Sequence, residues 1–191
     1  LKEYTQRGGS LIIFPSLDAD LGSLGNLLQN LGTDLPEQIV SEETRVASMN
    51  LQHPIFKGVF EQIPQKLDLP MAKKYIRFSL QSRTNRQSLL ELPGRRGFFN
   101  EYHLGNGKIY LSAVPLADDA TNFARHSVFV PIMFQVALLS QRDQKIFYTL
   151  GKDQSLEIPK IALKANQTLK LRKDKFDAIP DVRQRDNSTQ L

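Results

Sequence analysis

The sequence predicts an α/β fold with a doubly wound, mostly parallel β-sheet and a short β-rich C-terminal extension. Residues 10–15 form an apolar run between Gly-Gly and Pro, which is typical of a strand buried on both faces of a parallel sheet. A helix end precedes this run, and residues 18–31 follow it with leucines at helical spacing. The order helix, strand, helix favours helices layered on a sheet.

The first two helices have clear end signals. Residues 1–6 are typical of the last turns of a helix, which Gly8 and Gly9 end because glycine adopts the left-handed conformation of a helix exit. A chain that opens on a helix end predicts an N-terminally truncated fold. We expect the helix over 18–31 to begin with Asp18 or Asp20 as its N-cap and to end at a glycine.

The middle of the chain predicts strands. Residues 44–50 indicate one strand and residues 53–60 a short helical turn; residues 75–80, 87–92, 97–104 and 107–114 indicate four consecutive strands. Gly105-Asn106-Gly107 is a strong hairpin signal, because the central residues of a tight turn need or tolerate positive φ. Alternation in the last two strands predicts one partly wet face, formed by Phe99, Glu101, His103, Lys108, Tyr110 and Ser112.

Residues 123–140 return to a helix, and the chain then changes character. This helix is apolar nearly all round, which predicts a buried helix with Pro131 in its first turn. We expect one domain over 1–145 and a β-rich extension, or the start of a second domain, over 146–191. Its strand-like runs are 146–150, 155–159 and 168–172, and residues 181–191 predict a disordered polar tail.

Composition excludes several chemistries. The chain has no cysteine, so disulfides, thiolate metal sites and cysteine nucleophiles are excluded. Its net charge of +5 is uneven, since residues 73–96 carry seven Lys or Arg against one acidic residue. That basic stretch could meet an anionic polymer or a membrane surface. No aromatic residues interleave with Arg83, Arg86, Arg95 and Arg96, so we expect no nucleic-acid partner.

Six residues are candidates for a ligand site: Asp18, Asp20, His53, Asp118, Asn122 and His126. The aspartates follow strands, where open α/β sheets place their ligand sites, and carboxylates there bind cations, act as general bases or cap helices. The histidines lack zinc-motif spacing, so we expect no metal site and no cofactor. Serine-hydrolase, Walker and dinucleotide-binding motifs are absent from the sequence.

Three segments together resemble a known family. Residues 1–15 (LKEYTQRGGSLIIFP), 53–60 (HPIFKGVF) and 107–116 (GKIYLSAVPL) resemble the class I glutamine amidotransferase-like fold in its non-amidotransferase branches. Closer still, they are similar to BatA-type, aerotolerance-related envelope proteins of Bacteroidetes, to which residues 122–131 also fit. The resemblance implies a flavodoxin-like sheet over about residues 1–145, on the periplasmic side of a membrane-anchored inner-membrane protein whose partners are other envelope proteins.

The missing cysteine decides what the resemblance implies for activity. Glutamine amidotransferases use a cysteine on a sharp strand-to-helix turn, and this chain has none. No catalytic residue is therefore carried over, and we expect a non-catalytic interaction or ligand-binding domain. Two alternatives stay open. One is a metal-assisted hydrolase that uses Asp18, Asp20, His53 or His126; the other is binding of an anionic polymer or membrane surface through residues 73–96.

Overall fold

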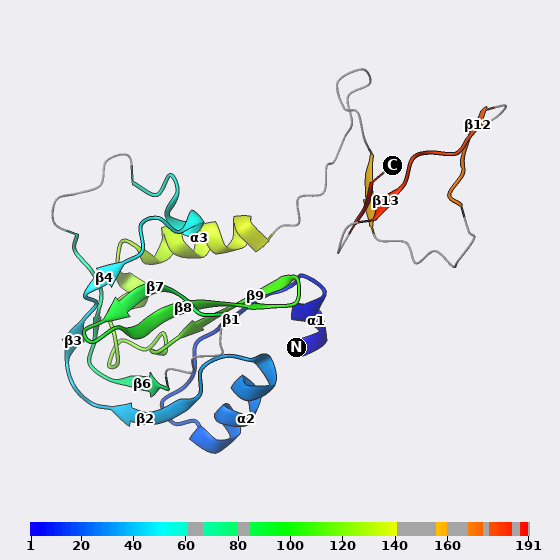
Figure 1. Cartoon of the computed structure of the whole chain (residues 1–191). Coiled ribbons are helices and arrows are strands. Elements are labelled where there is room, and N and C mark those ends of the chain that lie inside the picture. The colour runs from blue at the N-terminus through cyan, green and yellow to red at the C-terminus, as the bar shows by residue number, and fades with distance from the viewer. Residues whose placement is uncertain are drawn as a thin grey trace. The chain divides into compact units, whose positions relative to one another are not determined.

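The chain divides into two compact units, Leu1–Arg142 and Asp143–Leu191. The computed structural model describes residues 1–60, 67–79, 85–140, 156–159, 168–173, 176–184 and 188–190 (Figure 1). The predicted strand over 146–150 and part of the basic stretch, residues 80–84 with Arg83, lie outside the described residues.

A five-stranded mixed sheet organises the first unit. Its order is β1-β9-β8-β7-β4, with bounds β1 Ser10–Ile13, β9 Gly107–Ser112, β8 Arg96–Leu104, β7 Gln87–Leu92 and β4 Ser48–Met49. β1 pairs in parallel with β9, whereas the other three pairs are antiparallel. The register sets Ser10 beside Lys108 and His103 beside Lys108, so the three strands are aligned at their hairpin end.

Each face of this sheet has its own apolar core. Helix α2 (Leu21–Leu31) packs through Leu28 and Leu31 on Tyr102, Ile109 and Leu111. On the opposite face lie α3 (Phe129–Ser140) and the short 3₁₀ helix η1 (Pro54–Phe56), as Figure 1 shows for the two α-helices. There Phe99, Tyr110 and Phe123 pack with α3 residues Ile132 and Val136.

Local sequence signals explain the ends of the helices. The Asp20 side chain accepts a hydrogen bond from the Ser23 amide at 2.7 Å, and Gly32 ends α2 with a left-handed φ of 71°. The predicted aspartate cap and glycine stop of this helix are therefore confirmed. Pro131 lies in the first turn of α3, where a missing N–H costs no helical hydrogen bond. Helix α1 (Lys2–Gln6) gives way to Gly8, whose φ is 99°.

The predicted β8–β9 hairpin is confirmed, with Gly105 at a φ of 60° in its turn. Gly107, which opens β9, is needed for a different reason. A Cβ there would lie 2.1 Å from the Thr5 carbonyl oxygen and 2.3 Å from the Gly9 carbonyl oxygen. The hairpin therefore packs directly on the backbone of α1, and the Asn106 amide donates to the Gln6 carbonyl at 3.2 Å.

Smaller elements complete both units. In the first unit, β2 (Pro36–Val40) pairs with β6 (Tyr75–Phe78), β3 (Thr44–Arg45) pairs with β5 (Met71–Ala72), and η2 spans Phe123–Arg125. In the second unit, β14 (Ser188–Gln190) pairs with β10 (Glu157–Pro159) and with β13 (Arg183–Gln184), and β11 (Leu171–Lys173) pairs with β12 (Phe176–Ala178). Strands β13 and β14 lie within the segment for which the sequence predicts a disordered tail.

The predicted doubly wound, mostly parallel sheet is wrong. The described part of the chain has a single parallel pair, β1 with β9, and three α-helices. The physical reason is the length of the connections, since parallel neighbours need a crossover of a dozen or more residues. Only residues 93–95 separate β7 from β8, and only residues 105–106 separate β8 from β9, so these strands form an antiparallel meander.

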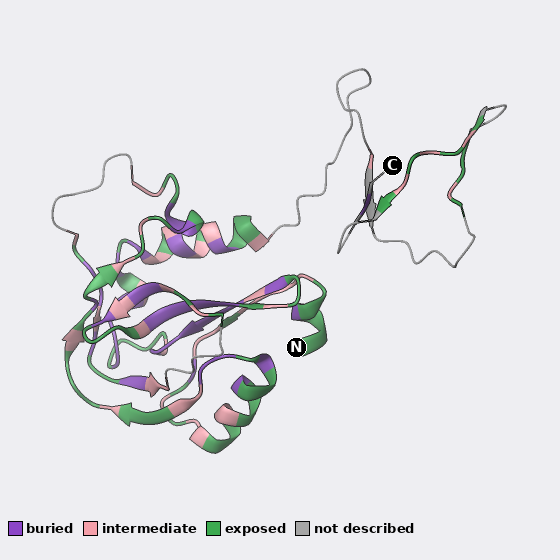
Figure 2. Ribbon diagram, in the orientation of Figure 1, coloured by how far each residue is buried: buried purple, intermediate pink, exposed green. Residues whose placement is uncertain are grey.

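The prediction that α3 is buried all round is also wrong. Ile132 and Val136 face the sheet, but Val130, Phe134 and Leu138 lie on the outer side, and Phe134 is 60% exposed. Figure 2 shows exposed residues interspersed with buried ones along this helix. The spacing of four residues between the outer side chains forms an apolar stripe on the surface of the first unit.

Candidate functional site

A buried carboxylate gathers three basic side chains on the face of the sheet beneath α3. Glu101 on β8 is 1% exposed, and its Oε1 atom lies 3.7 Å from His53 Nε2, 3.4 Å from His103 Nε2 and 3.2 Å from Lys108 Nζ. Tyr110 stands opposite Glu101 in the register of β8 and β9. We call these five residues the Glu101 cluster.

The strand pattern brings these residues together. Glu101 and His103 are two residues apart on β8, and Lys108 and Tyr110 are two apart on β9, so all four project from one face. His53 belongs to the layer that covers this face of the sheet, because it is the N-cap of η1, directly before Pro54. The cluster therefore joins the hairpin to the layer that covers it.

Charge keeps Glu101 ionised despite its burial. Burial alone raises the pKa of a carboxyl group, but the hydrogen bond from His53 and the positive charge of Lys108 outweigh it and lower the pKa of Glu101 to about 2. The pKa of Tyr110 is raised, because the ring is buried and the hydroxyl lies near the negative charge of Glu101. The Tyr110 hydroxyl interacts with the Glu101 carboxylate, although it makes no hydrogen bond of ordinary geometry to any described residue.

The two imidazoles of the cluster have different surroundings. His53 is buried, and its Nδ1 accepts the Ile55 amide at 3.3 Å, so its Nε2 carries the proton that faces Glu101. Both nitrogens of His53 are therefore engaged in holding η1 on the sheet. His103 is 40% exposed at its side chain, and Lys108 is 26% exposed, so these two residues form the part of the cluster that solvent reaches.

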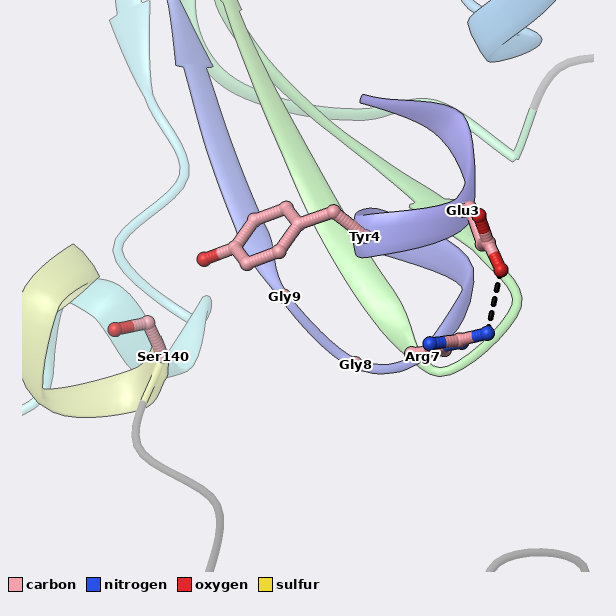
Figure 3. A pocket seen from close by; sticks show the side chains of 6 residues that line it. All are labelled: Glu3, Tyr4, Arg7, Gly8, Gly9 and Ser140. Atoms are coloured by element: carbon pink, nitrogen blue, oxygen red, sulfur yellow. Dashed lines mark hydrogen bonds and ion pairs between the residues drawn. The ribbon is translucent and has the colours of Figure 1, made fainter.

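A hollow of about 530 Å³ lies at the same end of the sheet, between α1 and the last residue of α3. It is lined by Glu3, Tyr4, Arg7, Gly8, Gly9 and Ser140. Figure 3 shows the Tyr4 ring extending across Gly9 toward Ser140, while Glu3 and Arg7 form an ion pair with each other away from that ring. We call this feature the Tyr4 hollow.

Gly9 determines how the Tyr4 ring lies. A Cβ at Gly9 would be 2.3 Å from a ring carbon, so only glycine allows the ring to rest on the backbone. Tyr4 is nevertheless 59% exposed, which leaves much of the ring open to solvent. The Gly9 carbonyl also accepts the Lys108 amide at 3.3 Å, and this bond joins the floor of the Tyr4 hollow to the main chain of β9.

The structure disperses the six residues predicted from the sequence. Asp20 caps α2, Asp18 is exposed, and Asp118 forms an ion pair with Arg125. Asn122 accepts the Met71 amide at 2.7 Å. Among the predicted residues, His53 alone belongs to the Glu101 cluster.

His126 has surroundings that parallel those of His53. Its Nδ1 accepts the Val128 amide at 3.4 Å, and its Nε2 lies 3.5 Å from Asp68 Oδ2 without hydrogen-bond geometry. His126 is buried, whereas Asp68 is exposed and also pairs with Arg45 at 2.9 Å. No three histidine, cysteine or acidic side chains in the described ranges are grouped so that they could hold a metal ion.

Several basic residues of the 73–96 stretch have acidic partners. Arg77 pairs with Glu37 at 3.0 Å, and Lys74 with Asp119 at 3.9 Å. Arg86 lies 3.2 Å from the buried Asp34, which also accepts the Tyr102 hydroxyl at 3.0 Å. Arg95 and Arg96 are exposed in and beside the turn between β7 and β8.

Sequence reasoning missed four of the five residues of the Glu101 cluster and all of the Tyr4 hollow. The sequence signal for the cluster was the alternation of polar and apolar residues in β8 and β9, which predicts a partly wet face. In the structure Glu101, Tyr110 and Ser112 are buried, and only His103 and Lys108 of the alternating polar set reach solvent. The Gly8-Gly9 pair predicts a helix end, and it also provides the flat floor under Tyr4.

Comparison with known proteins shows similarity of fold alone. No family model and no curated protein matches the chain. The structure resembles the cytoplasmic protein STM3548 from Salmonella typhimurium (TM-score 0.55, 14% identity), covering 72% of this chain and 57% of that one. It also resembles the cytoplasmic protein STM1381 from Salmonella typhimurium LT2 (TM-score 0.53, 16% identity), covering 74% of this chain and 59% of that one. The chain thus spans less than two thirds of either protein.

These findings correct the expectations that rest on the family resemblance. The mixed sheet does not match a glutamine amidotransferase-like, flavodoxin-like domain. The predicted periplasmic location on a membrane-anchored, BatA-like protein is contradicted, because both proteins of similar fold are described as cytoplasmic. Among the described residues, no helix has the length and apolar character needed to cross a membrane.

Proposed function

We propose that this chain is a ligand-binding module and that its ligand has a planar ring that stacks on Tyr4. The observation that carries the proposal is a tyrosine that rests on glycine backbone and is still 59% exposed. Aromatic rings bind planar groups by offset stacking, and a ring supported from behind loses little freedom when a ligand covers it.

The size of the Tyr4 hollow supports this proposal. Ligand pockets in proteins commonly enclose about 300–1,000 Å³, and the hollow measures about 530 Å³. Its wall is the apolar ring of Tyr4, its floor is the backbone of Gly8 and Gly9, and Ser140 supplies a hydroxyl at the far side (Figure 3).

Binding without chemical conversion is favoured by the roles of the predicted site residues. The carboxylate of Asp20 caps a helix, the His53 ring contacts the Ile55 amide and Glu101, and the His126 ring lies beside Asp68. Each side chain makes a contact that supports the fold. The dispersal of these residues supports a binding role over the metal-assisted hydrolase.

The test of stacking is an NMR titration with benzyl alcohol, a neutral aromatic probe. We expect shifts in the Tyr4 ring and in the Gly8 and Gly9 amides, and a loss of about tenfold in affinity for Tyr4→Ala, the effect of a stacking contact of about 1–1.5 kcal/mol. Tyr4→Phe is the matched control, because it keeps the ring. The proposal fails if the probe moves none of these resonances, or if Tyr4→Ala binds as well as the native chain.

The non-catalytic part of the proposal needs a separate test. Purified protein is offered ester, amide and phosphate-ester substrates, and we expect no turnover above the rate in buffer. Turnover that is abolished by Asp18→Ala or His126→Ala would overturn the proposal and favour the hydrolase alternative.

A further inference from the structure

We infer that a second hollow, at the β4 edge of the sheet, binds a primary ammonium group on the carboxylate of Glu91. This hollow measures about 290 Å³ and is lined by Ser48, Met49, Asn50, Ser88 and Glu91. Strands β1 and β4 are the two edges of the five-stranded sheet, so the hollow lies at the edge away from β1. We call it the Glu91 hollow, and an ammonium group bound there is independent of a ring bound at Tyr4.

Irregular strand pairing brings two residues of β7 to this hollow. Ser88 and Glu91 are three residues apart, and in a regular strand such positions point to opposite faces. The pairing of β7 with β8 is irregular between them, because the register shifts on both sides of Leu90. Bulges of this kind re-aim side chains and are frequent next to active sites. The irregular segment therefore explains how Ser88 and Glu91 come to line the same hollow.

Glu91 is a half-buried carboxylate without a basic partner among the described residues. In the described part of the first unit, the carboxylates that are not exposed are Asp34, Glu91 and Glu101. Arg86 pairs with Asp34 at 3.2 Å, and Lys108 pairs with Glu101 at 3.2 Å. Within the described ranges the Glu91 side chain receives one hydrogen bond, from the Ser48 hydroxyl to Oε2 at 3.3 Å, and its Oε1 receives none. A carboxylate partly removed from water is stabilised by a positive charge, so this position favours a cationic ligand.

The protons of both serine hydroxyls in the hollow are committed to protein acceptors. Ser48 donates to Glu91, and Ser88 Oγ donates to Asn100 Oδ1 at 2.9 Å. A hydroxyl group has one proton and two lone pairs, so each serine has only lone pairs left for a ligand. Asn100 is 1% exposed and lies over Gly97, where a Cβ would be 2.0 Å from its Nδ2 atom. The buried amide therefore fixes the Ser88 hydroxyl as an acceptor.

These acceptors match the donors of a primary ammonium group. Such a group carries three N–H donors and no lone pair. Glu91 Oε1, Ser88 Oγ and the Asn50 carboxamide oxygen can each accept one of them, and the bond to the carboxylate is charge-assisted. An anion would meet the negative charge of Glu91, and a neutral ligand would leave that charge without a partner.

The experiment compares n-butylamine, an ammonium ion at pH 7, with n-butanol, which has the same chain and no charge. By NMR titration of the full chain we expect the amine to shift the backbone amide resonances of Asn50, Ser88 and Glu91. It should bind about tenfold more tightly than the alcohol, as a charge-assisted hydrogen bond provides. Equal affinity for the amine and the alcohol would overturn the inference.

Three further probes define the class of ligand. Tetramethylammonium has the charge without an N–H donor, and we expect it to bind no more tightly than the alcohol; affinity equal to that of n-butylamine would overturn the inference. Calcium ions that shift the same resonances at lower concentration than the amine would also overturn it, because they would make the hollow a metal site. The tighter of n-butylamine and Nα-acetyllysine amide identifies the source of the ammonium group as a free amine or a lysine side chain.

Glu91→Gln tests the assigned carboxylate, because it removes the charge and keeps an acceptor for the Ser48 hydroxyl. It should abolish the tenfold advantage of the amine, whereas Glu43→Gln, at an exposed carboxylate outside the hollow, should preserve it. If Glu91→Gln does not fold, Asn50→Ala at an exposed residue takes its place, with an expected loss of about threefold in amine affinity for one neutral hydrogen bond. Full amine affinity in the variant that folds would overturn the inference.

Tyr4→Ala separates this site from the proposed function. It should weaken benzyl alcohol binding and leave the affinity for n-butylamine unchanged, because the Tyr4 ring does not line the Glu91 hollow. Loss of amine binding in Tyr4→Ala would overturn the assignment of the ammonium group to Glu91.

Discussion

His53 Nε2 lies 3.7 Å from Glu101 Oε1, and both side chains are less than 6% exposed. This pair joins η1 to strand β8 across the interface between the helical layer and the sheet. A buried carboxylate costs free energy unless it is paired and hydrogen-bonded. The relationship therefore makes the stability of this unit depend on a polar contact inside an otherwise apolar layer.

Stability should depend on the ionisation of Glu101. Its pKa in the folded chain is lowered to about 2 from an ordinary value of 4.5. The resulting stabilisation is present above pH 4.5 and is lost as the pH falls toward 2, because the unfolded chain then binds a proton that the folded chain refuses. The loss is on the order of 3 kcal/mol.

Urea denaturation between pH 7 and pH 2.5 measures this dependence. Glu101→Gln should flatten the acid limb of the stability curve, whereas Glu42→Gln, at an exposed carboxylate, should leave it unchanged. A native curve that stays flat from pH 5 to pH 2.5 would contradict the role assigned to Glu101.

The two imidazoles that face Glu101 should differ in their contribution to stability. His53→Ala removes a buried ring and leaves the Ile55 amide without its acceptor, so we expect a loss of about 2–4 kcal/mol in the free energy of unfolding. His103→Ala removes a side chain that is 40% exposed, and we expect a loss below about 1 kcal/mol. Equal losses in chemical denaturation would show that His103 also has a structural role.

Gly107 should tolerate no side chain. An added Cβ meets backbone oxygens of Thr5 and Gly9 at 2.1 and 2.3 Å, so Gly107→Ala must separate the hairpin from α1 at a cost of about 2 kcal/mol or more. Gly25 in α2 is the matched control, since its nearest neighbour would be 3.7 Å away. Gly25→Ala should stabilise the chain by about 0.5–1 kcal/mol through helix propensity. Thermal unfolding measures the stability of both variants. A Gly25→Ala variant that is less stable than Gly107→Ala would contradict the prediction.

The outer stripe of α3 should contribute little to stability. Ile132 is fully buried and Phe134 is 60% exposed, so Ile132→Ala should cost about 2–4 kcal/mol and Phe134→Ala less than about 1 kcal/mol. Both substitutions lie in the same helix, so the two variants directly measure which side of α3 faces the core. A large loss for Phe134→Ala in urea denaturation would mean that this face is covered in solution.

Short-range signals were sufficient for the elements whose ends depend on neighbouring residues. The Asp20 cap, the Gly32 stop, the hairpin turn at Gly105 and Pro131 in the first turn of α3 all follow from local backbone chemistry. The polar alternation of β8 and β9 likewise located the strands that carry Glu101 and Lys108.

Strand order and the composition of the site depended on contacts between distant segments. The apolar run of β1 is compatible with either a parallel or an antiparallel sheet, and only pairing with β9, nearly a hundred residues later, places it at a sheet edge. Likewise, His53 meets Glu101 because η1 packs on the sheet, and Tyr4 becomes a platform because Gly9 runs beneath it. Local chemistry determines where elements begin and end, but the free energy of burying two apolar faces determines which elements become neighbours, and that depends on the whole unit at once.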